Sequence, residues 1–191
     1  MSTAVRLEVN DELWLRQIGD NDAAVLFEQI EQNRDHLRRY LNWVDQMKQI
    51  DDARKFIQTC HQRTADLKGI TFVIFLKGKI IGSIALYDWI HETKCIHMGY
   101  WISQAHSNKG MTTRCAEVLL SYAFSELEME KVQLYFLPEN TASERIADKL
   151  GFKIEGYIRK SFMLHGILKD QYLAGLIREE YLNRYSPHHT R

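Results

Sequence analysis

The chain has 191 residues, of which 45% are hydrophobic and 26% are charged. That apolar content is sufficient for one compact core, and the length favours a single domain over residues 1–191. The 25 basic and 25 acidic residues cancel, which argues against nucleic-acid or anionic-lipid binding driven by overall charge.

The composition also predicts the setting of the protein. Residues 1–14 hold no apolar core of signal-peptide length, and no later run approaches the roughly 20 apolar residues of a membrane helix. We therefore expect a cytoplasmic protein with no membrane partner. Cys60, Cys95 and Cys115 form no CxxC pair, and the eight histidines show no HxxxH or HxxEH spacing. These spacings favour neither a disulfide framework nor a metal site.

The first third of the chain predicts one strand and three helices. Residues 12–18 alternate between apolar and polar side chains, as a half-buried strand does. A helix follows, with Asp20 or Asp22 as its N-cap. A second helix is predicted over residues 34–44 ("RDHLRRYLNWV"), and a third starts at Asp51, where apolar residues recur at helical spacing.

The middle of the chain predicts strands and a crossover. Residues 71–89 contain two β-branched runs split by Gly78, which indicates a hairpin. Residues 95–102 ("CIHMGYWI") form the next predicted strand, residues 116–127 a helix, and residues 131–137 another strand. A strand, helix and strand in this order predict a parallel pair joined by a right-handed crossover.

The last third predicts a helix and two more strands. The helix lies within residues 138–152, with Asn140 or Thr141 as N-cap, Glu144 completing a capping box on Thr141, and Gly151 ending it. Residues 152–158 and 171–179 complete the sheet, and residues 182–191 are predicted as a polar tail. The elements together predict an α+β fold with a mixed sheet, flanking helices and one parallel crossover.

A single glycine stands where the strand over residues 95–102 gives way to a helix, in "HSNKGMTTR" (residues 106–114). The stretch does not match GxxxxGK[ST], because the lysine precedes the glycine, and it lacks the three glycines of a dinucleotide fingerprint. The remaining interpretation is a tight turn at a helix N-terminus, where the backbone amides and Lys109 bind a phosphate. The alternative is an ordinary solvated loop.

A second segment resembles a known family. Asn140 and Ser143 stand in "NTAS", followed by "KLGF" (residues 149–152) and "EG" (residues 155–156). With the glycine loop upstream, this pattern is similar to that of the GNAT superfamily of acyl-CoA-dependent N-acetyltransferases. The resemblance implies the GNAT-type, mostly antiparallel sheet and acetyl-CoA as co-substrate. It also implies that coenzyme A is bound by Ile102, Ser107, Asn108, Lys109, Gly110, Met111, Thr112 and Asn140.

The resemblance extends to one branch of the superfamily. The segments "NRDHLRRYLNWV", "GYWIS" and "NKGMTTR" look like those of the RimJ/RimL branch, which acetylates protein N-termini, including those of ribosomal proteins. This similarity covers nearly the whole chain. It implies that a primary amine, foremost a protein N-terminal α-amine, is the acceptor, and it allows a homodimer. A small-molecule or polyamine acetyltransferase and a non-catalytic acyl-CoA-binding module are the alternatives.

Three positions depart from the branch. Asn108 stands where a glycine is usual, and asparagine tolerates the left-handed backbone of such a turn. Ser107 replaces a longer glutamine or arginine. Phe162 occupies the position, six residues after Gly156, where the branch carries a glutamate proposed as general base. A phenylalanine accepts no proton. The protein therefore uses another general base, needs little assistance from a base, or does not catalyse the reaction.

The candidate catalytic residues each have a structural alternative. His97 lies on the strand before the glycine loop, where the superfamily often places a base, but a lone strand histidine also serves as a packed residue. Asp88 is a weaker candidate and suits a turn. By resemblance, Ser143 would protonate the departing thiolate; otherwise it is a serine in a first helical turn. The aromatic residues Trp43, Trp89, Tyr100 and Trp101 either line an acceptor groove or belong to the core.

Overall fold

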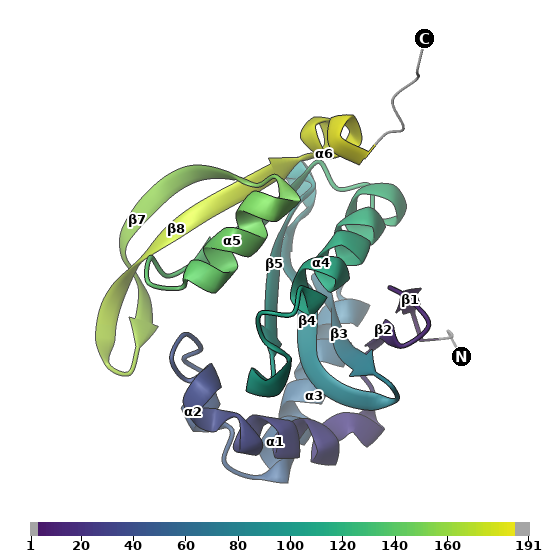
Figure 1. Ribbon diagram of the computed structural model, residues 1–191, viewed down its shortest axis with the longest axis vertical. Helices are drawn as coiled ribbons and strands as arrows, with labels where there is room; N and C mark the ends of the chain where they lie inside the picture. Colours follow the sequence, from purple (N-terminus) through teal and green to yellow (C-terminus); the bar gives the residue numbers. More distant parts are fainter. Residues whose placement is uncertain (1–3, 186–191) are drawn as a thin grey trace.

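Strands form one open sheet in the computed structural model, which describes residues 4–185 (Figure 1). Eight strands of this part of the chain are ordered β1-β2-β3-β4-β5-β6-β8-β7, and every neighbouring pair is antiparallel except β5 and β6. The predicted mixed, mostly antiparallel sheet with one parallel crossover is confirmed. The strands are β1 (Arg6–Glu8), β2 (Leu13–Gln17), β3 (Gly69–Leu76), β4 (Lys79–Ile90), β5 (Cys95–Ile102), β6 (Lys131–Phe136), β7 (Lys153–Leu164) and β8 (Ile167–Ile177).

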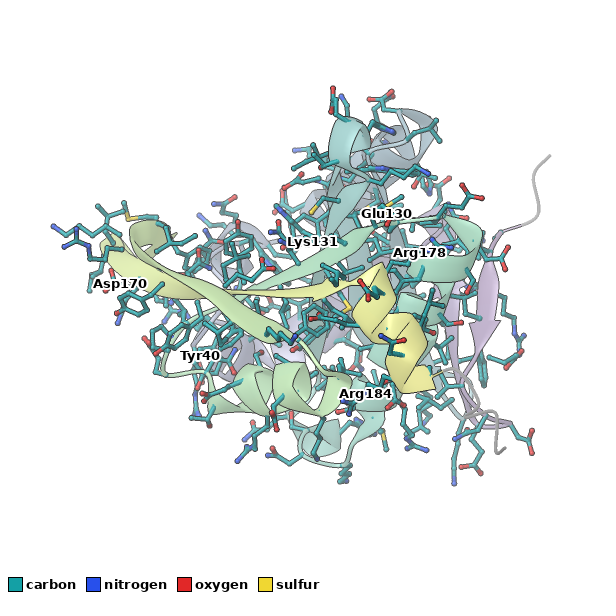
Figure 2. All side chains as sticks on the ribbon, turned by 90° about the horizontal axis from the view of Figure 1, so that it is seen from above. Tyr40, Glu130, Lys131, Asp170, Arg178 and Arg184 are labelled. Carbon is teal, nitrogen blue, oxygen red and sulfur yellow. The ribbon has the colours of Figure 1, made fainter. Side chains whose placement is uncertain are left out.

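Helices cover both faces of the sheet (Figure 1). One face carries α1 (Ala23–Gln32) and α3 (Ile50–Ala65), and the other carries α4 (Met111–Ser121) and α5 (Thr141–Leu150). The last helix, α6 (Arg178–Tyr185), continues from β8, and its Arg184 Nη2 donates to Lys149 O at the end of α5 at 2.6 Å (Figure 2). No helix in residues 4–185 combines the length and apolarity needed to cross a membrane.

The central strands are buried from both sides, which explains their nearly continuous apolar sequences. Phe72 and Ile74 of β3 belong to the core cluster under α4, and Val73 belongs to the cluster under α1 and α3. All three side chains are fully buried. A strand covered on both faces loses the alternation that marks a half-buried one, so residues 71–76 read as an unbroken run.

The parallel strands β5 and β6 pair over four residues and then separate. Their pairing runs from Cys95 opposite Lys131 to Met98 opposite Leu134. Beyond that point β5 remains paired with β4 as far as Ile102, and β6 remains paired with β8 as far as Phe136. An opening therefore lies within the sheet at the ends of β5 and β6, where α4 and α5 begin.

The helix predicted over residues 34–44 is wrong beyond its first turn. Helix α2 covers only Arg34–Leu37, and a 3-10 turn, η2, follows at Val44–Gln46. The guanidinium of Arg34 donates to Val44 O at 2.6 Å and also to Met47 O, drawing the chain back on itself. Val44 and Met47 then pack into the core under α1 and α3. Tertiary contacts outweigh the local helical pattern here.

Other boundaries also differ from the predictions. The short strand β1 was not predicted, and α4 begins at Met111, directly after the glycine loop, with a π-helical turn over Tyr122–Glu126 at its end. The last two strands extend into a long hairpin that turns at His165 and Gly166, both with positive φ. Helix α6 includes residues 182–185 of the predicted tail, and residues 186–191 lie outside the described part.

We predict that Arg34→Ala destabilises the protein by about 1–3 kcal/mol, because the carbonyls of Val44 and Met47 lose a charged donor. Chemical denaturation measures this free energy of unfolding. Arg54→Ala on α3 is the matched control, since Arg54 makes only an exposed ion pair with Asp51 and such pairs contribute ~0–1 kcal/mol. Equal losses in the two variants would contradict the role given to Arg34.

Candidate active site

Two cavities meet at the opening between β5 and β6. They share part of their walls, so a molecule in one cavity can touch a molecule in the other. The shared wall comes from the loop after α2, from β5 and from the start of α5. Its residues are Tyr40, Leu41, Tyr100, Trp101, Asn140 and Ser143.

The first cavity, of about 690 Å³, has a strongly positive wall. Arg39, Lys109, Arg145 and Lys149 line it, and its lining within residues 4–185 contains no aspartate or glutamate. We call it the basic cavity. Arg145 and Lys149 lie one helical turn apart on α5, so they present their charges on the same face of that helix. Such a wall favours a ligand that carries several negative charges.

The glycine loop forms one side of the basic cavity. Gly110 is the N-cap of α4 with φ of 73°, and Asn108 has φ of 58°, so both adopt the left-handed backbone, which asparagine was expected to tolerate. Helix α4 thereby starts in the cavity wall, where its unpaired N–H groups favour an anion. The structure brings all the residues predicted to bind coenzyme A to this one cavity: Ile102, Ser107, Asn108, Lys109, Gly110, Met111, Thr112 and Asn140.

Two histidines hold the glycine loop in place through serine hydroxyls. Ser107 Oγ lies 3.3 Å from His36 Nε2, and Ser103 Oγ lies 2.7 Å from His106 Nδ1. Burial lowers the pKa of both histidines, and the positive charges of Arg39 and Lys109 lower it further for His36 and His106 respectively. Ser107 thus holds the loop against α2, a role that its short side chain permits.

The start of α5 reaches the junction of the two cavities. Asn140 caps the helix, since its Oδ1 accepts a hydrogen bond from Ser143 N at 3.2 Å. The cap is therefore Asn140 rather than Thr141. Ser143 is buried, with 8% of its surface exposed, and it lines both cavities. Its position at the shared wall is compatible with donation to a group held between the cavities.

Tyr100 lies beside Ser143 at the same junction. Its ring lines both cavities, while its hydroxyl oxygen is buried and has no hydrogen-bond partner within 3.5 Å in the described residues. Burial raises the pKa of Tyr100 to about 12. Tyr100 therefore keeps its proton at neutral pH and remains a hydrogen-bond donor.

The second cavity, of about 630 Å³, lies on the α1 and α3 side of the opening and is mainly apolar. Trp43, Phe56, Trp101, Tyr135 and Phe162 are among its lining residues, and we call it the aromatic cavity. The rings of Trp43 and Trp101 have centroids 6.4 Å apart. Trp43 and Trp101 therefore line a groove, which was one of the two alternatives for the aromatic residues.

The hairpin of β7 and β8 closes one side of the aromatic cavity. Phe162 and Gln171 of the hairpin line the cavity. At the hairpin's turn, His165 Nε2 lies 2.7 Å from Arg38 O in the loop after α2. Figure 2 views this hairpin from above, with Asp170 labelled on it and Tyr40 labelled near the loop. Phe162 therefore faces the cavity from the position where the related branch carries a glutamate.

His97 lies behind the wall of the aromatic cavity. Its ring packs edge-on against Tyr87 and Tyr135, with centroids 5.6 Å and 5.2 Å away, and these two tyrosines line the cavity. His97 is not among the described residues that line either cavity. Its Nδ1 is 3.8 Å from Asp88 Oδ2, and Asp88 occupies an exposed, left-handed position at the β4 bulge. The structure does not bring His97 or Asp88 into contact with Ser143.

The wall contains basic residues that the sequence reasoning missed. Four basic residues from outside the glycine loop reach the basic cavity only because α2, the loop after it and α5 pack there. They are His36, Arg39, Arg145 and Lys149. The spacing of Arg145 and Lys149 was a usable signal, because residues four apart on a helix share a face. Within residues 4–185, no cluster of three His, Cys, Asp or Glu is arranged to hold a metal ion.

Comparisons with known proteins agree with this geometry. Residues 12–153 match the family described as Acetyltransferase (GNAT) domain. The ribosomal-protein-serine acetyltransferase of Escherichia coli (strain K12) is 25% identical, over 86% of this chain and 92% of its own length. The microcin C7 self immunity acetyltransferase MccE, solved with acetyl-CoA and AMP, is 25% identical with a TM-score of 0.84, covering 88% of this chain and 94% of that one.

A further solved structure shares the fold. RimL, a ribosomal L7/L12 alpha-N-protein acetyltransferase solved with coenzyme A, has a TM-score of 0.88 at 18% identity. The match covers 92% of this chain and 99% of RimL. The α+β fold predicted from the sequence is thus also the fold of an acetyltransferase.

We predict that the ligand-free protein loses stability as the pH falls through about 6.5. His36 and His106 have lower pKa values in the folded chain than the ordinary value, so the unfolded chain binds more protons in this range and acid favours unfolding. Urea denaturation from pH 8 to pH 5.5 measures the slope.

The double variant His36→Gln, His106→Gln should show a shallower loss over the same range. His91→Gln, at an exposed position on the 3-10 turn after β4, is the control and should retain the slope of the parent. A double variant with the full slope of the parent would show that the two histidines do not cause the acid sensitivity.

Proposed function

The chain belongs to the GNAT acetyltransferase family, and from this premise we propose that it transfers an acetyl group from acetyl-CoA to a protein N-terminal α-amine. The observation that carries the proposal is the meeting of the basic and aromatic cavities at Ser143 and Tyr100. An anionic acyl donor suits the first cavity, and an acceptor with an apolar body suits the second. The thioester and the amine then meet at the shared wall.

The basic cavity fits coenzyme A chemically. The phosphates of coenzyme A are anionic, and the cavity offers Lys109, the free N–H groups at the start of α4, and the cations of α5. Gly110 leaves open space where a side chain would stand, since a Cβ placed there meets no atom within 4 Å. MccE, with the same fold, is a protein that binds acetyl-CoA, which supports acetyl-CoA as the donor.

The proposed reaction is direct transfer. The neutral amine attacks the thioester carbonyl carbon, a C–N bond forms, and the C–S bond breaks. The amine gives up one proton and the departing thiolate gains one. Ser143 donates toward the sulfur, and a β5 backbone N–H beyond Met98, where pairing with β6 has ended, stabilises the carbonyl oxygen.

The aromatic cavity offers little help in removing a proton from the amine. Phe162 stands in its wall without a proton acceptor, and the cavity's carboxylate, Asp52, caps α3 by accepting from Lys48 N and Gln49 N at 3.0 and 3.1 Å. An α-amine has a pKa near ~7.8 and a lysine amine near ~10.4, so deprotonation at pH 7 costs about 1 and about 4.6 kcal/mol respectively. This difference supports the α-amine as acceptor.

Phe162 also favours a second candidate function. A protein that keeps the basic cavity but lacks a carboxylate base suits a non-catalytic acyl-CoA sensor. Release of free coenzyme A in the presence of peptides with a free N-terminus distinguishes an acetyltransferase from a sensor, because a sensor binds acetyl-CoA without turnover.

Gly110→Ala should weaken acetyl-CoA binding by at least tenfold, because a methyl group enters the space in front of the α4 amides and strains the left-handed backbone. Gly78→Ala is the matched control: its φ of 79° is close to the 73° of Gly110, and its Cβ also meets open space, but it lies in the β3–β4 turn. Calorimetric titration gives both affinities. Equal binding by the two variants would exclude the glycine loop as the phosphate site.

Ser143→Ala should lower kcat by about tenfold or more with little change in acetyl-CoA affinity, because a donor to the leaving thiolate is lost. The helix cap survives, since Asn140 binds the backbone N–H of residue 143. Ser125→Ala, at an exposed position on the π-helical turn after α4 and outside the lining of both cavities, controls for general effects. Unchanged turnover in the Ser143 variant would leave Ser143 a purely structural role.

A peptide with a free N-terminus should be acetylated faster at pH 7 than one with only a free lysine, and the difference should narrow as the pH rises toward 9.5. His97→Gln tests the remaining base candidate. If His97 assists through Tyr87 or Tyr135, the variant loses rate mainly near neutral pH. A pH-independent ratio of variant to parent removes His97 from the mechanism, and faster lysine acetylation at pH 7 contradicts the α-amine preference.

A further inference from the structure

Three ionisable groups define the charge of the aromatic cavity. Its lining includes two cations, Lys55 and Arg63 of α3, and the single carboxylate of Asp52. Asp52 lies in the first turn of α3, where the helix N-terminus and two backbone N–H groups already compensate its charge. Lys55 and Arg63 have no side-chain ion pair or hydrogen bond within residues 4–185. The uncompensated charge of the wall is therefore positive.

The position of Arg63 fixes one end of the cavity. Arg63 lies at the end of the cavity beside Tyr87, because Lys68 N donates to Arg63 O at 2.8 Å and Trp89 N, two residues along β4 from Tyr87, donates to Lys68 O at 3.2 Å. Tyr87 is paired with His97 on β5, and Ile84 is paired with Tyr100. Three residues along a strand span about 10 Å. Tyr87 therefore lies about 10 Å along the sheet from the junction where the amine is proposed to react, and Arg63 lines the cavity at the Tyr87 end.

The rest of the wall is apolar and aromatic. Trp43, Trp101 and Phe162 line it together with Phe56, which is 37% exposed. Burying an aromatic side chain against such a wall is favourable. Binding of a polyamine in this cavity is unfavourable. A polyamine is positively charged, and the described wall already has cations without ion-pair partners and lacks a free carboxylate.

We infer that the preferred acceptor is a peptide-like α-amine with a bulky apolar first side chain and an anionic group about three residues from the amine. This inference rests on the proposed function and specifies its acceptor. An extended chain advances about 3.3–3.6 Å per residue, so three residues cover the distance from the junction to Arg63. The aromatic wall binds the first side chain, and Arg63 binds the anion.

The test uses four amines with acetyl-CoA and follows both coenzyme A release and product mass. The peptides are Phe-Ala-Asp-Ala-amide, Ser-Ala-Asp-Ala-amide and Phe-Ala-Asn-Ala-amide, and the fourth amine is spermidine. The phenylalanine peptide should exceed the serine peptide in kcat/KM by about tenfold or more. It should exceed its asparagine counterpart by about threefold or more through charge complementarity, and it should exceed spermidine by about tenfold or more.

Two variants test whether Arg63 and Phe56 cause the acceptor preference. Arg63→Gln should bring the aspartate-to-asparagine ratio close to one, whereas Arg54→Gln on the same helix, outside the cavity lining, should retain the parent ratio. Phe56→Ser, at an exposed position on α3, should lower the phenylalanine-to-serine ratio. Thermal midpoints verify that each variant is folded.

The inference is overturned if the serine peptide or spermidine matches the phenylalanine peptide, or if folded Arg63→Gln keeps the parent ratio. A different result would contradict the proposed function itself: acetyl-CoA binds, and none of the four amines is acetylated. The two failures are therefore distinguishable in one set of assays.

Discussion

The site depends on the separation of two parallel strands. β5 and β6 pair only as far as Met98 and Leu134, while each keeps its outer partner, β4 or β8, to its own end. The outer pairing prevents either strand from bending across to close the gap. Gly82 allows β4 to follow β5 closely there, since a Cβ at this position would lie 2.3 Å from Trp101 O. The inner edges of the strands are left without strand partners.

Unpaired backbone groups in such a gap need hydrogen-bond partners. The pantetheine arm of acetyl-CoA contains amides, which are partners of the required kind. The same gap determines where the helices begin, because α4 follows β5 and α5 follows β6. Both helix N-termini therefore face the opening, that of α4 at the basic cavity and that of α5 at the wall shared by the two cavities. A single break in strand pairing thus determines where the basic cavity, Ser143 and the connection between the two cavities lie.

Charged side chains are distributed unevenly between the two cavities, although the formal net charge of the chain is zero. The cations of the basic cavity come from the loop after α2, the glycine loop and α5, and no carboxylate lies in its described wall. The aromatic cavity has few charges and a wall of indole and phenyl rings. The two sides of Tyr100 therefore offer different environments, one suited to phosphates and the other to an apolar group. The absence of a carboxylate at Phe162 is consistent with an acceptor amine that deprotonates readily at neutral pH.

Local sequence was sufficient to predict the parts of the site that are local in the chain. The glycine loop, the Asn140 cap and the strand, helix and strand order depend on neighbouring residues, and their predicted positions agree with the structure. The contributions of Arg39 and Arg145 depend on how distant segments pack. The Arg34 bonds that end α2 early, and the tyrosines that separate His97 from the aromatic cavity, are likewise tertiary effects. No periodicity in the sequence encodes the Arg34 bonds or the positions of these tyrosines, whereas the four-residue spacing of Arg145 and Lys149 indicates only that they share a helix face.

A crystal structure with a bisubstrate analogue tests the central claim most directly. The analogue joins coenzyme A, through an acetyl bridge on its sulfur, to the N-terminus of a short peptide. The account predicts phosphates against the amides of Gly110 and Met111, the sulfur beside Ser143 and Tyr100, and the peptide between Trp43 and Phe162. A peptide bound outside the aromatic cavity, or phosphates bound away from the start of α4, would contradict it.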